Sequence, residues 1–301
     1  MLLHSIWAAL EASSDSLGNY AYPAMDKSVA ELSLPSDWFT WVAAINLFGS
    51  NAFTIAQFMR IFPYGLVQAN KESFSTAIQH GYLAADGKGG YRATESGESL
   101  GKRTFGDANK AIAQLQPMSA ESLQRLIDLL ARISNAAFAT PEPPSHFILA
   151  HKREMYRRLG MKESLSGFVA HCLELEGCRD DAYITTWKAH GVEGHAWDVL
   201  DQLSQNDGLT FDELHDKTSR RGVTREVHAE DVKELARRGW VEDDSRRIQI
   251  TLAGKQVRAE VEAETERLFF APWSCLNESE LEELASLANQ LLEGLKKNET
   301  N

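Results

Sequence analysis

The stretch ARRGWVEDDSRRIQITLAGK, from Ala236 to Lys255, decides the fold of this chain. It brings a polar helical segment to Gly239, places an aromatic residue at Trp240, and continues with an acidic turn, two arginines and an alternating Ile-Gln-Ile-Thr run. A glycine at a helix end lets the chain turn, and alternation around a polar turn is typical of paired short strands. The stretch therefore predicts a helix followed by a hairpin.

Three further segments lead into this hairpin: HAWDVLDQLSQNDG, TFDELHDKTSRRG and VTREVHAEDVKELARRGW. Their apolar residues recur at helical spacing. Thr210 and Glu213 form a Thr-x-x-Glu capping box, and Thr224 is placed to cap the third helix. The C-terminal half thus predicts three helices and a hairpin.

The same order of elements occurs earlier in the chain. Helical segments within residues 36–49, 51–63 and 64–81 precede GYLAADGKGGYRATESG, which predicts two short strands around a glycine-rich turn, with Thr94 capping the next helix. Gly81-Tyr82-Leu83 corresponds to Gly239-Trp240-Val241, and Thr94-Glu95-Ser96-Gly97 corresponds to Thr251-Leu252-Ala253-Gly254. The sequence therefore predicts an internal duplication of architecture.

The rest of the chain is helical in pattern. The middle segments ESLQRLIDLLARISNAAF, FILAHKREMYRRLG, ESLSGFVAHCLELEG and DDAYITTWKAHG each have apolar residues three to four apart, enough for a small bundle. The tail carries a leucine stripe on one helical face, made of Leu281, Leu284, Leu287, Leu291 and Leu295. Such a stripe needs a partner surface, either within the chain or in a second copy.

We therefore predict a mainly α fold in which two winged helix-turn-helix domains, each of three helices plus a β-hairpin wing, flank a helical bundle. The predicted divisions are an N-terminal helical extension (1–36), a first winged-helix domain (37–105), a bundle linker domain (106–191), a second winged-helix domain (192–256) and C-terminal helices for packing or dimerisation (257–301).

Composition narrows the class of protein. The formal net charge of −12 opposes nucleic-acid binding at first sight, but residues 51–104 carry 6 basic against 4 acidic side chains, and residues 210–255 carry 10 against 10. No apolar run approaches the ~20 residues that a membrane span needs, and the N-terminus lacks a signal-peptide pattern. The expected location is therefore cytoplasmic, with no membrane partner. The three cysteines lack CxxC spacing, which argues against a disulfide framework or a zinc ribbon.

Residues from Val232 to Leu295 resemble the C-terminal half of a MarR-type winged-helix regulator. The resemblance lies in LARRGWVEDDSRRIQITLAGKQVRAEVEAETERLF followed by LNESELEELASLANQLLEGL. The first copy is similar to winged-helix domains generally, and the middle bundle has no counterpart in a short MarR chain. The resemblance implies a tandem or fused relative that binds DNA and regulates transcription.

In such a domain the third helix enters the major groove and the wing contacts the backbone or the minor groove. Gln and Asn read adenine, and cations of the turn and wing contact phosphates. The candidate DNA-binding residues are Gln68, Asn70, Lys71, Lys88, Arg92, Arg220, Arg221, Arg225, Arg246 and Arg247. The third helix of the second predicted winged-helix domain also carries Glu226, Glu230 and Asp231, whose negative charge argues against DNA binding.

The middle bundle suggests a sensor. A cavity between bundle and winged helices is expected to hold an apolar small-molecule effector. Its candidate contacts are Tyr156, Phe168, His171, Arg179, Trp187 and Trp197. We predict neither a metal site nor a cofactor, because His146 and His151 are five residues apart and diverge by roughly 140° around a helix.

Motifs of catalysis are not evident in the sequence, with no GxSxG, P-loop or HExxH. Two other hypotheses stay open: a winged-helix-derived ligand-binding protein or enzyme that no longer binds DNA, and a protein-interaction scaffold. A homodimer through the C-terminal helices is also compatible with the sequence.

Overall fold

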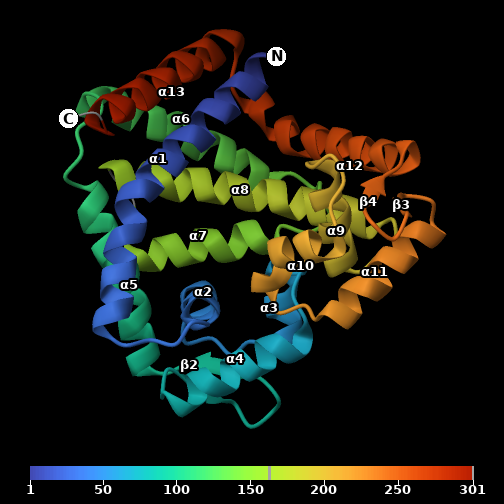
Figure 1. Cartoon of the computed structure of the whole chain (residues 1–301). Coiled ribbons are helices and arrows are strands. Elements are labelled where there is room, and N and C mark those ends of the chain that lie inside the picture. Colours follow the sequence, from blue (N-terminus) through green and yellow to red (C-terminus); the bar gives the residue numbers. More distant parts are fainter. Residues whose placement is uncertain (162–163, 300–301) are drawn as a thin grey trace.

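The computed structural model describes residues 1–161 and 164–299 and consists mainly of helices (Figure 1). The first elements are α1 (Leu2–Glu31), α2 (Trp38–Phe48), α3 (Ile55–Ile61), α4 (Val67–Gln79), β1 (Leu83–Ala85), β2 (Tyr91–Ala93), α5 (Glu95–Ile112), α6 (Ala120–Ala139) and α7 (Phe147–Leu159). They are followed by α8 (Ser164–Lys188), α9 (Gly194–Ser204), α10 (Phe211–Thr218), η1 (Ser219–Arg221), α11 (Arg225–Arg237), β3 (Val241–Asp243), β4 (Ile248–Ile250), α12 (Leu252–Phe270), η2 (Ala271–Cys275) and α13 (Glu278–Glu299).

The predicted order of helix, helix, helix and hairpin is present twice. We call α2 to β2 (residues 38–93) the N-terminal unit and α9 to β4 (residues 194–250) the C-terminal unit. In each unit the two strands pair antiparallel, and a residue before the second helix forms an extra bridge to the hairpin: Phe53 to Tyr91 and Leu209 to Ile248. The two units therefore share their hydrogen-bonding pattern as well as their element order.

The exit from each hairpin is built by an equivalent threonine. Thr94 Oγ1 donates to the carbonyl of Gly81 at 2.6 Å, and Thr251 Oγ1 donates to the carbonyl of Gly239 at 2.6 Å. Each threonine oxygen also accepts a backbone N–H of the first turn that follows, in α5 or α12. The correspondence inferred from the sequence is thus reproduced atom by atom at this junction.

A glycine in each of these first turns permits close approach to the residue that begins the hairpin. A Cβ on Gly97 would stand 2.1 Å from the carbonyl oxygen of Tyr82, and a Cβ on Gly254 would stand 2.2 Å from that of Trp240. Real Cβ atoms do not come so close to a backbone oxygen. The Thr-x-x-Gly pattern is therefore a packing requirement in both units.

The middle of the chain differs from the prediction at α8. The segments ESLSGFVAHCLELEG and DDAYITTWKAHG, predicted as two helices, form one helix of 25 residues. Gly177, the last residue of the first of these segments, lies where α8 packs on α7: a Cβ there would stand 3.2 Å from the backbone nitrogen of Leu149 and 2.9 Å from Cδ of Lys152. The glycine serves helix packing instead of helix termination.

Asp181 shows a second consequence of this continuity. It lies inside α8, where its carboxylate accepts the backbone N–H groups of Ile148 and Leu149 at 3.0 Å. It therefore caps the first turn of α7 from a position inside another helix. Burial raises the pKa of Asp181 to about 6, although these backbone donors favour the ionised form.

Two apolar cores meet at α8, which lies at the centre of the molecule (Figure 1). One core joins both units to α7 and the C-terminal half of α8, through side chains such as Phe53, Trp187 and Trp197. The other joins α1, α6, α8, η2 and α13, through side chains such as Leu130 and Phe168. The middle bundle is therefore completed by both ends of the chain, and the predicted boundaries at 105/106 and 256/257 fall inside α5 and α12.

The leucine stripe of the tail is covered within the chain. Leu284, Leu291 and Leu295 are fully buried, and α13 packs against α1 and α6. A homodimer would therefore need a surface other than this stripe.

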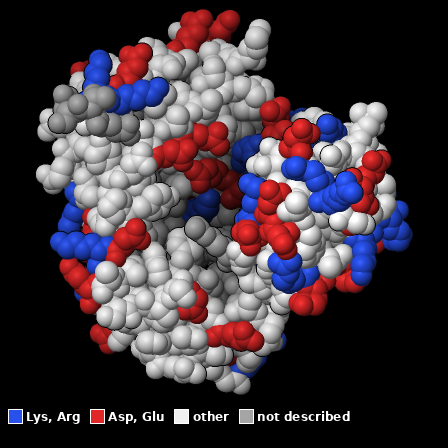
Figure 2. All heavy atoms as spheres, viewed as in Figure 1, with Lys and Arg blue, Asp and Glu red and all other residues white. Residues whose placement is uncertain are grey.

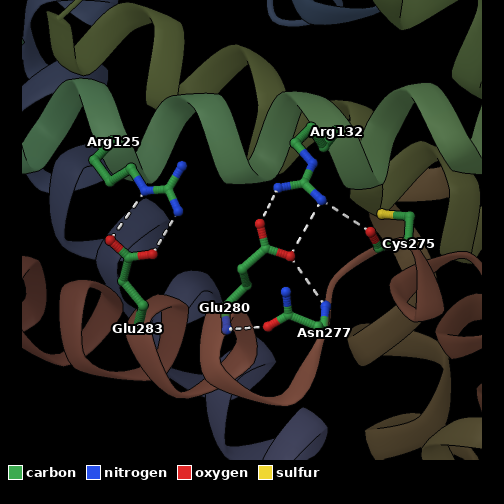
Figure 3. Close-up of polar contacts among 6 residues, drawn as sticks. All are labelled: Arg125, Arg132, Cys275, Asn277, Glu280 and Glu283. Atoms are coloured by element: carbon green, nitrogen blue, oxygen red, sulfur yellow. Dashed lines mark hydrogen bonds and ion pairs between the residues drawn. The ribbon is translucent and has the colours of Figure 1, made fainter.

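Figure 3 shows how α6 holds α13. Arg125 donates from Nε and Nη2 to the two carboxylate oxygens of Glu283 at 2.9 and 2.6 Å, and Arg132 pairs with Glu280. Arg132 Nη2 also donates to the carbonyl of Cys275 at 2.9 Å, just before the helix begins. Paired arginines on one helix thus fix the register of the other.

Candidate nucleic-acid interface

The third helix of the C-terminal unit, α11, begins after a left-handed residue, Gly222 (φ 69°), and is capped by Thr224, as predicted. The second helix, α10, begins with the predicted capping box of Thr210 and Glu213. Val232 and Leu235 turn inward. Most of the remaining surface of α11 is exposed, and the β3–β4 hairpin follows it, so this unit has the elements of a helix-turn-helix with a wing.

Polar side chains connect α10 to α11 inside the unit. His215 Nδ1 and His228 Nδ1 are 2.9 Å apart, so one of these two nitrogens donates and the other accepts. His228 Nε2 lies 3.3 Å from the hydroxyl of Thr218, at the end of α10. Burial lowers the pKa of His228 to about 4, which keeps the imidazole neutral near pH 7.

A second polar pair connects α9 to α11. His195 Nδ1 lies 2.8 and 2.9 Å from the two carboxylate oxygens of Asp231, and this hydrogen bond raises the pKa of His195. Asp231 is only 5% exposed. We expected its carboxylate on the DNA-facing side, but it is an internal group of the unit, which leaves Glu226 and Glu230 as the exposed acids from that set.

Most of the other charges of α11 and the wing are paired locally. Arg225 forms an ion pair with Asp212 and lies over the ring of Phe211. On the hairpin, Arg247 Nη2 donates to the carbonyl of Gly208 at 2.6 Å. Arg246 is exposed, and its side chain makes no hydrogen bond or ion pair with the described residues.

The remaining cations of α11 are also matched by acids one turn away. Lys233 pairs with Glu230 at 2.7 Å, and Arg237 pairs with Glu234 at 2.8 Å. The face of the C-terminal unit in Figure 2 accordingly shows basic and acidic side chains interspersed. This unit offers phosphates little uncompensated positive charge.

The turn between α10 and α11 contacts the N-terminal unit. Arg221 binds the buried carboxylate of Asp198 at 2.7 Å and lies 4.8 Å above the ring of Tyr64. Burial raises the pKa of Asp198 to about 6, and the Arg221 guanidinium opposes that shift. Arg221 is thus held by Asp198 of its own unit and by Tyr64 of the N-terminal unit. The side chain of Arg220 lies outside the described part of the structure.

In the N-terminal unit the candidate residues divide into two groups. Gln68 donates to Glu72 at 2.8 Å, and Asn70 Nδ2 donates to the carbonyl of Leu66 at 3.0 Å, so both amides have partners within or beside α4. The side chains of the other group are exposed and make no hydrogen bond or ion pair with the described residues; its members are Lys71, Lys88 and Arg92. The less compensated positive surface is therefore on the N-terminal unit.

The turn between the second and third helices of one unit faces the equivalent turn of the other. A Cβ on Gly65 would stand 2.9 Å from the carbonyl oxygen of Arg221, and one on Gly222 would stand 2.7 Å from Cβ of Ala69. The N-terminal residues of a recognition helix contact base edges, and paired half-sites lie about 34 Å apart. With their first turns adjoining, α4 and α11 are too close to enter two successive major grooves in this arrangement.

Only one of the six candidate ligand residues lines a cavity described below. Tyr156 does so, whereas Phe168, Trp187 and Trp197 are fully buried parts of the two cores. The other two have side-chain partners: His171 lies 3.5 Å from Glu174, and Arg179 pairs with Glu262. Phe168, Trp187 and Trp197 thus hold the bundle and the units together, and contact of the six residues with an effector stays a prediction.

The sequence contained a signal for the polar interior that we did not use. His228 is four residues before Val232 and seven before Leu235, which places all three on one stripe of α11. Thr54-x-x-Gln57 is likewise a capping box that begins α3. The pairing of Asp198 with Arg221 had no local signal, because the two residues meet only when α9 packs beside the turn that follows α10.

Metal-binding clusters and membrane-spanning helices are absent from the described residues. No group of three or more His, Cys, Asp or Glu side chains within residues 1–161 and 164–299 is placed to hold a metal ion. No helix in the same ranges is both long and apolar enough to cross a membrane.

Comparison with known proteins agrees with this geometry in the C-terminal part. No curated protein and no solved structure matched the chain. Residues 175–300, which include the C-terminal unit, match the model of a helix-turn-helix family, so the C-terminal part of the chain contains a helix-turn-helix domain.

Proposed function

We propose that the chain binds double-stranded DNA as a transcriptional regulator built from two winged helix-turn-helix units. The observation that carries the proposal is the helix-turn-helix domain within residues 175–300, whose third helix lies exposed beside a hairpin. The resemblance of residues 232–295 to MarR-type regulators supports the same use. Structural duplication extends the proposal to the N-terminal unit.

Phosphate binding falls mainly to the N-terminal unit in this proposal. Lys71 on α4 and Lys88 and Arg92 on the hairpin are exposed and unpaired, and Arg246 adds one such cation from the other wing. Neutralising four phosphates gives log K a slope of about −3.6 against log salt. The chain's net charge of −12 makes this local set essential, since the rest of the surface repels DNA.

Because the first turns of α4 and α11 adjoin, one unit occupies a groove at a time unless the units separate. A change in the contact between the units would alter how the pair fits DNA. An effector acting on this contact would be a regulatory switch.

The second candidate is a ligand-binding protein that has lost DNA binding. The local charge pairing of α11, with Lys233 and Arg237 already neutralised by neighbouring acids, favours it. The two candidates differ in what happens when duplex DNA is added.

The test is retention of mixed genomic DNA fragments by the full chain at about 50 and about 200 mM salt. The regulator should bind at the lower salt and lose affinity about 100-fold at the higher one, as expected for four phosphate contacts. Absence of retention at the lower salt would contradict DNA binding and favour the second candidate.

A further inference from the structure

Three adjoining cavities form one hollow in the N-terminal half of the molecule. The outer cavity, about 440 Å³, lies between α2, the α3–α4 turn, α4 and η1. The middle cavity, about 200 Å³, lies among α1, α2, α3, α5, α7 and α8, and the inner cavity, about 230 Å³, lies between α1, α5, α7 and α8. The face drawn in Figure 2 is hollowed near α2 and α7.

Shared walls connect the three cavities. Phe39 lines all of them, Phe62 lines the outer and middle ones, and Met25 and Tyr156 line the middle and inner ones. The three cavities therefore follow one another along an elongated hollow and share side chains where they adjoin.

Large apolar side chains that line the hollow are exposed to solvent. Tyr22 and Phe39, which line the hollow, are 64% and 59% exposed, among the most exposed large apolar side chains of the described residues. Leu17, Phe105 and Met161 continue the apolar lining inward. Exposed aromatic side chains gathered around one concavity are typical of a binding site for an apolar molecule.

One polar group inside the hollow lacks a partner. Tyr156 is only 3% exposed, yet its hydroxyl makes no hydrogen bond to any residue in the described ranges. Burial raises the pKa of Tyr156 well above its usual value, so the phenol remains protonated and can donate. A hydroxyl that lines a cavity without a protein partner is available to donate to a ligand oxygen.

The charges at the edge of the hollow are already neutralised. Lys152 Nζ lies 3.6 Å from Glu176 and 3.5 Å from Asp180. In the outer cavity Arg221 binds Asp198. Neither cation is left to pair with an anionic ligand, which favours an uncharged one.

We propose that this hollow binds an elongated, uncharged aromatic molecule whose oxygen acceptor receives a hydrogen bond from Tyr156, and that binding changes the affinity for DNA. The second part rests on the proposed function. It follows from the outer cavity, whose walls include both Gly65 of the first turn and Arg221 and Gly222 of the second. A ligand extending there contacts the junction of the two helix-turn-helix turns, so its occupancy is linked to their separation.

Nile red, an uncharged fused-ring dye with a carbonyl oxygen, is the probe for the binding step. Its fluorescence should increase and saturate on titration with the full chain. Ala43→Phe fills the wall between the outer and middle cavities and should weaken binding at least ten-fold. Ala56→Phe, at an exposed position of α3, is the matched control and should bind as the unchanged chain does.

Tyr156→Phe keeps the ring and removes the donor, so it should weaken dye binding about five-fold, the effect of one hydrogen bond, without unfolding the protein. Unsaturable fluorescence, or equal affinity of Ala43→Phe and the control when both melt cooperatively, would overturn the site. An unchanged affinity in Tyr156→Phe would overturn the role assigned to its hydroxyl.

The DNA step is measured separately, by retention at about 50 mM salt with and without saturating Nile red. A change in DNA affinity that Ala43→Phe abolishes supports the linkage. Dye binding with no DNA binding would contradict the proposed function and the linkage while supporting the site. DNA binding without dye binding would contradict the inference alone, and binding of both without mutual effect would overturn the linkage.

Discussion

The environment of His228 makes the stability of the helix-turn-helix domain depend on pH. It faces His215 from α10 and lies near Asp231 on its own helix and His195 on α9. Its folded-state pKa of about 4 lies below the usual 6.5, so the stability from its neutral form is present above pH 6.5 and is lost as pH falls toward 4.

Between pH 7.5 and 5 this residue should therefore remove about 2 kcal/mol from the free energy of unfolding. Asp181 and Asp198 have raised pKa values and act in the opposite direction, because protonation of either favours the folded state as pH falls through about 6. The informative quantity is the difference between the unchanged chain and His228→Gln in urea titrations at each pH. A difference that does not vary with pH would contradict a buried neutral His228.

Asp181 supports a helix other than its own. Asp181→Ala removes the acceptor for the first N–H groups of α7 and should lower the free energy of unfolding by about 2 kcal/mol at pH 7. Asp180→Ala is the matched control, since the Asp180 side chain is 52% exposed and its ion pair among the described residues is with Lys152. It should change stability by less than about 1 kcal/mol. Equal effects in urea denaturation would show that Asp181 does not cap α7.

At the scale of elements, α13 should be part of the folded monomer. Leu291 is fully buried in the core that joins α13 to α1 and α6, so Leu291→Ala should destabilise the chain by about 2–5 kcal/mol. Leu252→Ala, at an 84% exposed position of α12, should stay within about 0.5 kcal/mol. Dependence of the unfolding midpoint of the unchanged chain on protein concentration would instead indicate that α13 is stabilised by a second copy.

The elements whose local signals agreed were predictable from the sequence. Helix starts were predicted from three signals, and the structure places the helices there. The signals are Thr210 with Glu213, Thr224, and the Thr-x-x-Gly at each hairpin exit. Gly177 shows the limit, because a glycine inside a helix has the same local appearance whether it ends the helix or admits a neighbour. Only the packing of α7 on α8 distinguishes the two.

At the scale of the molecule, the candidate site could be predicted only in part. Exposure of Lys71 and Lys88 follows from their polar and glycine-rich surroundings in the sequence, and exposure of Arg92 follows from its charge within a short predicted strand. The engagement of Arg221 could not be foreseen, since Asp198 meets it only when the helices of the C-terminal unit pack, and Tyr64 meets it only when the two units contact each other. The same contact brings α4 and α11 together and creates the outer cavity.

The most direct test of the account is the salt dependence of DNA affinity for the chain with Lys71, Lys88 and Arg92 all changed to Ala. If DNA binds through the N-terminal unit, the negative slope of log K against log salt should become shallower by about three relative to the unchanged chain. The control changes three exposed cations elsewhere, Lys102, Lys110 and Arg157, to Ala and should keep the slope within about one. Equal slopes for both triple variants, or no DNA binding by the unchanged chain, would contradict the account.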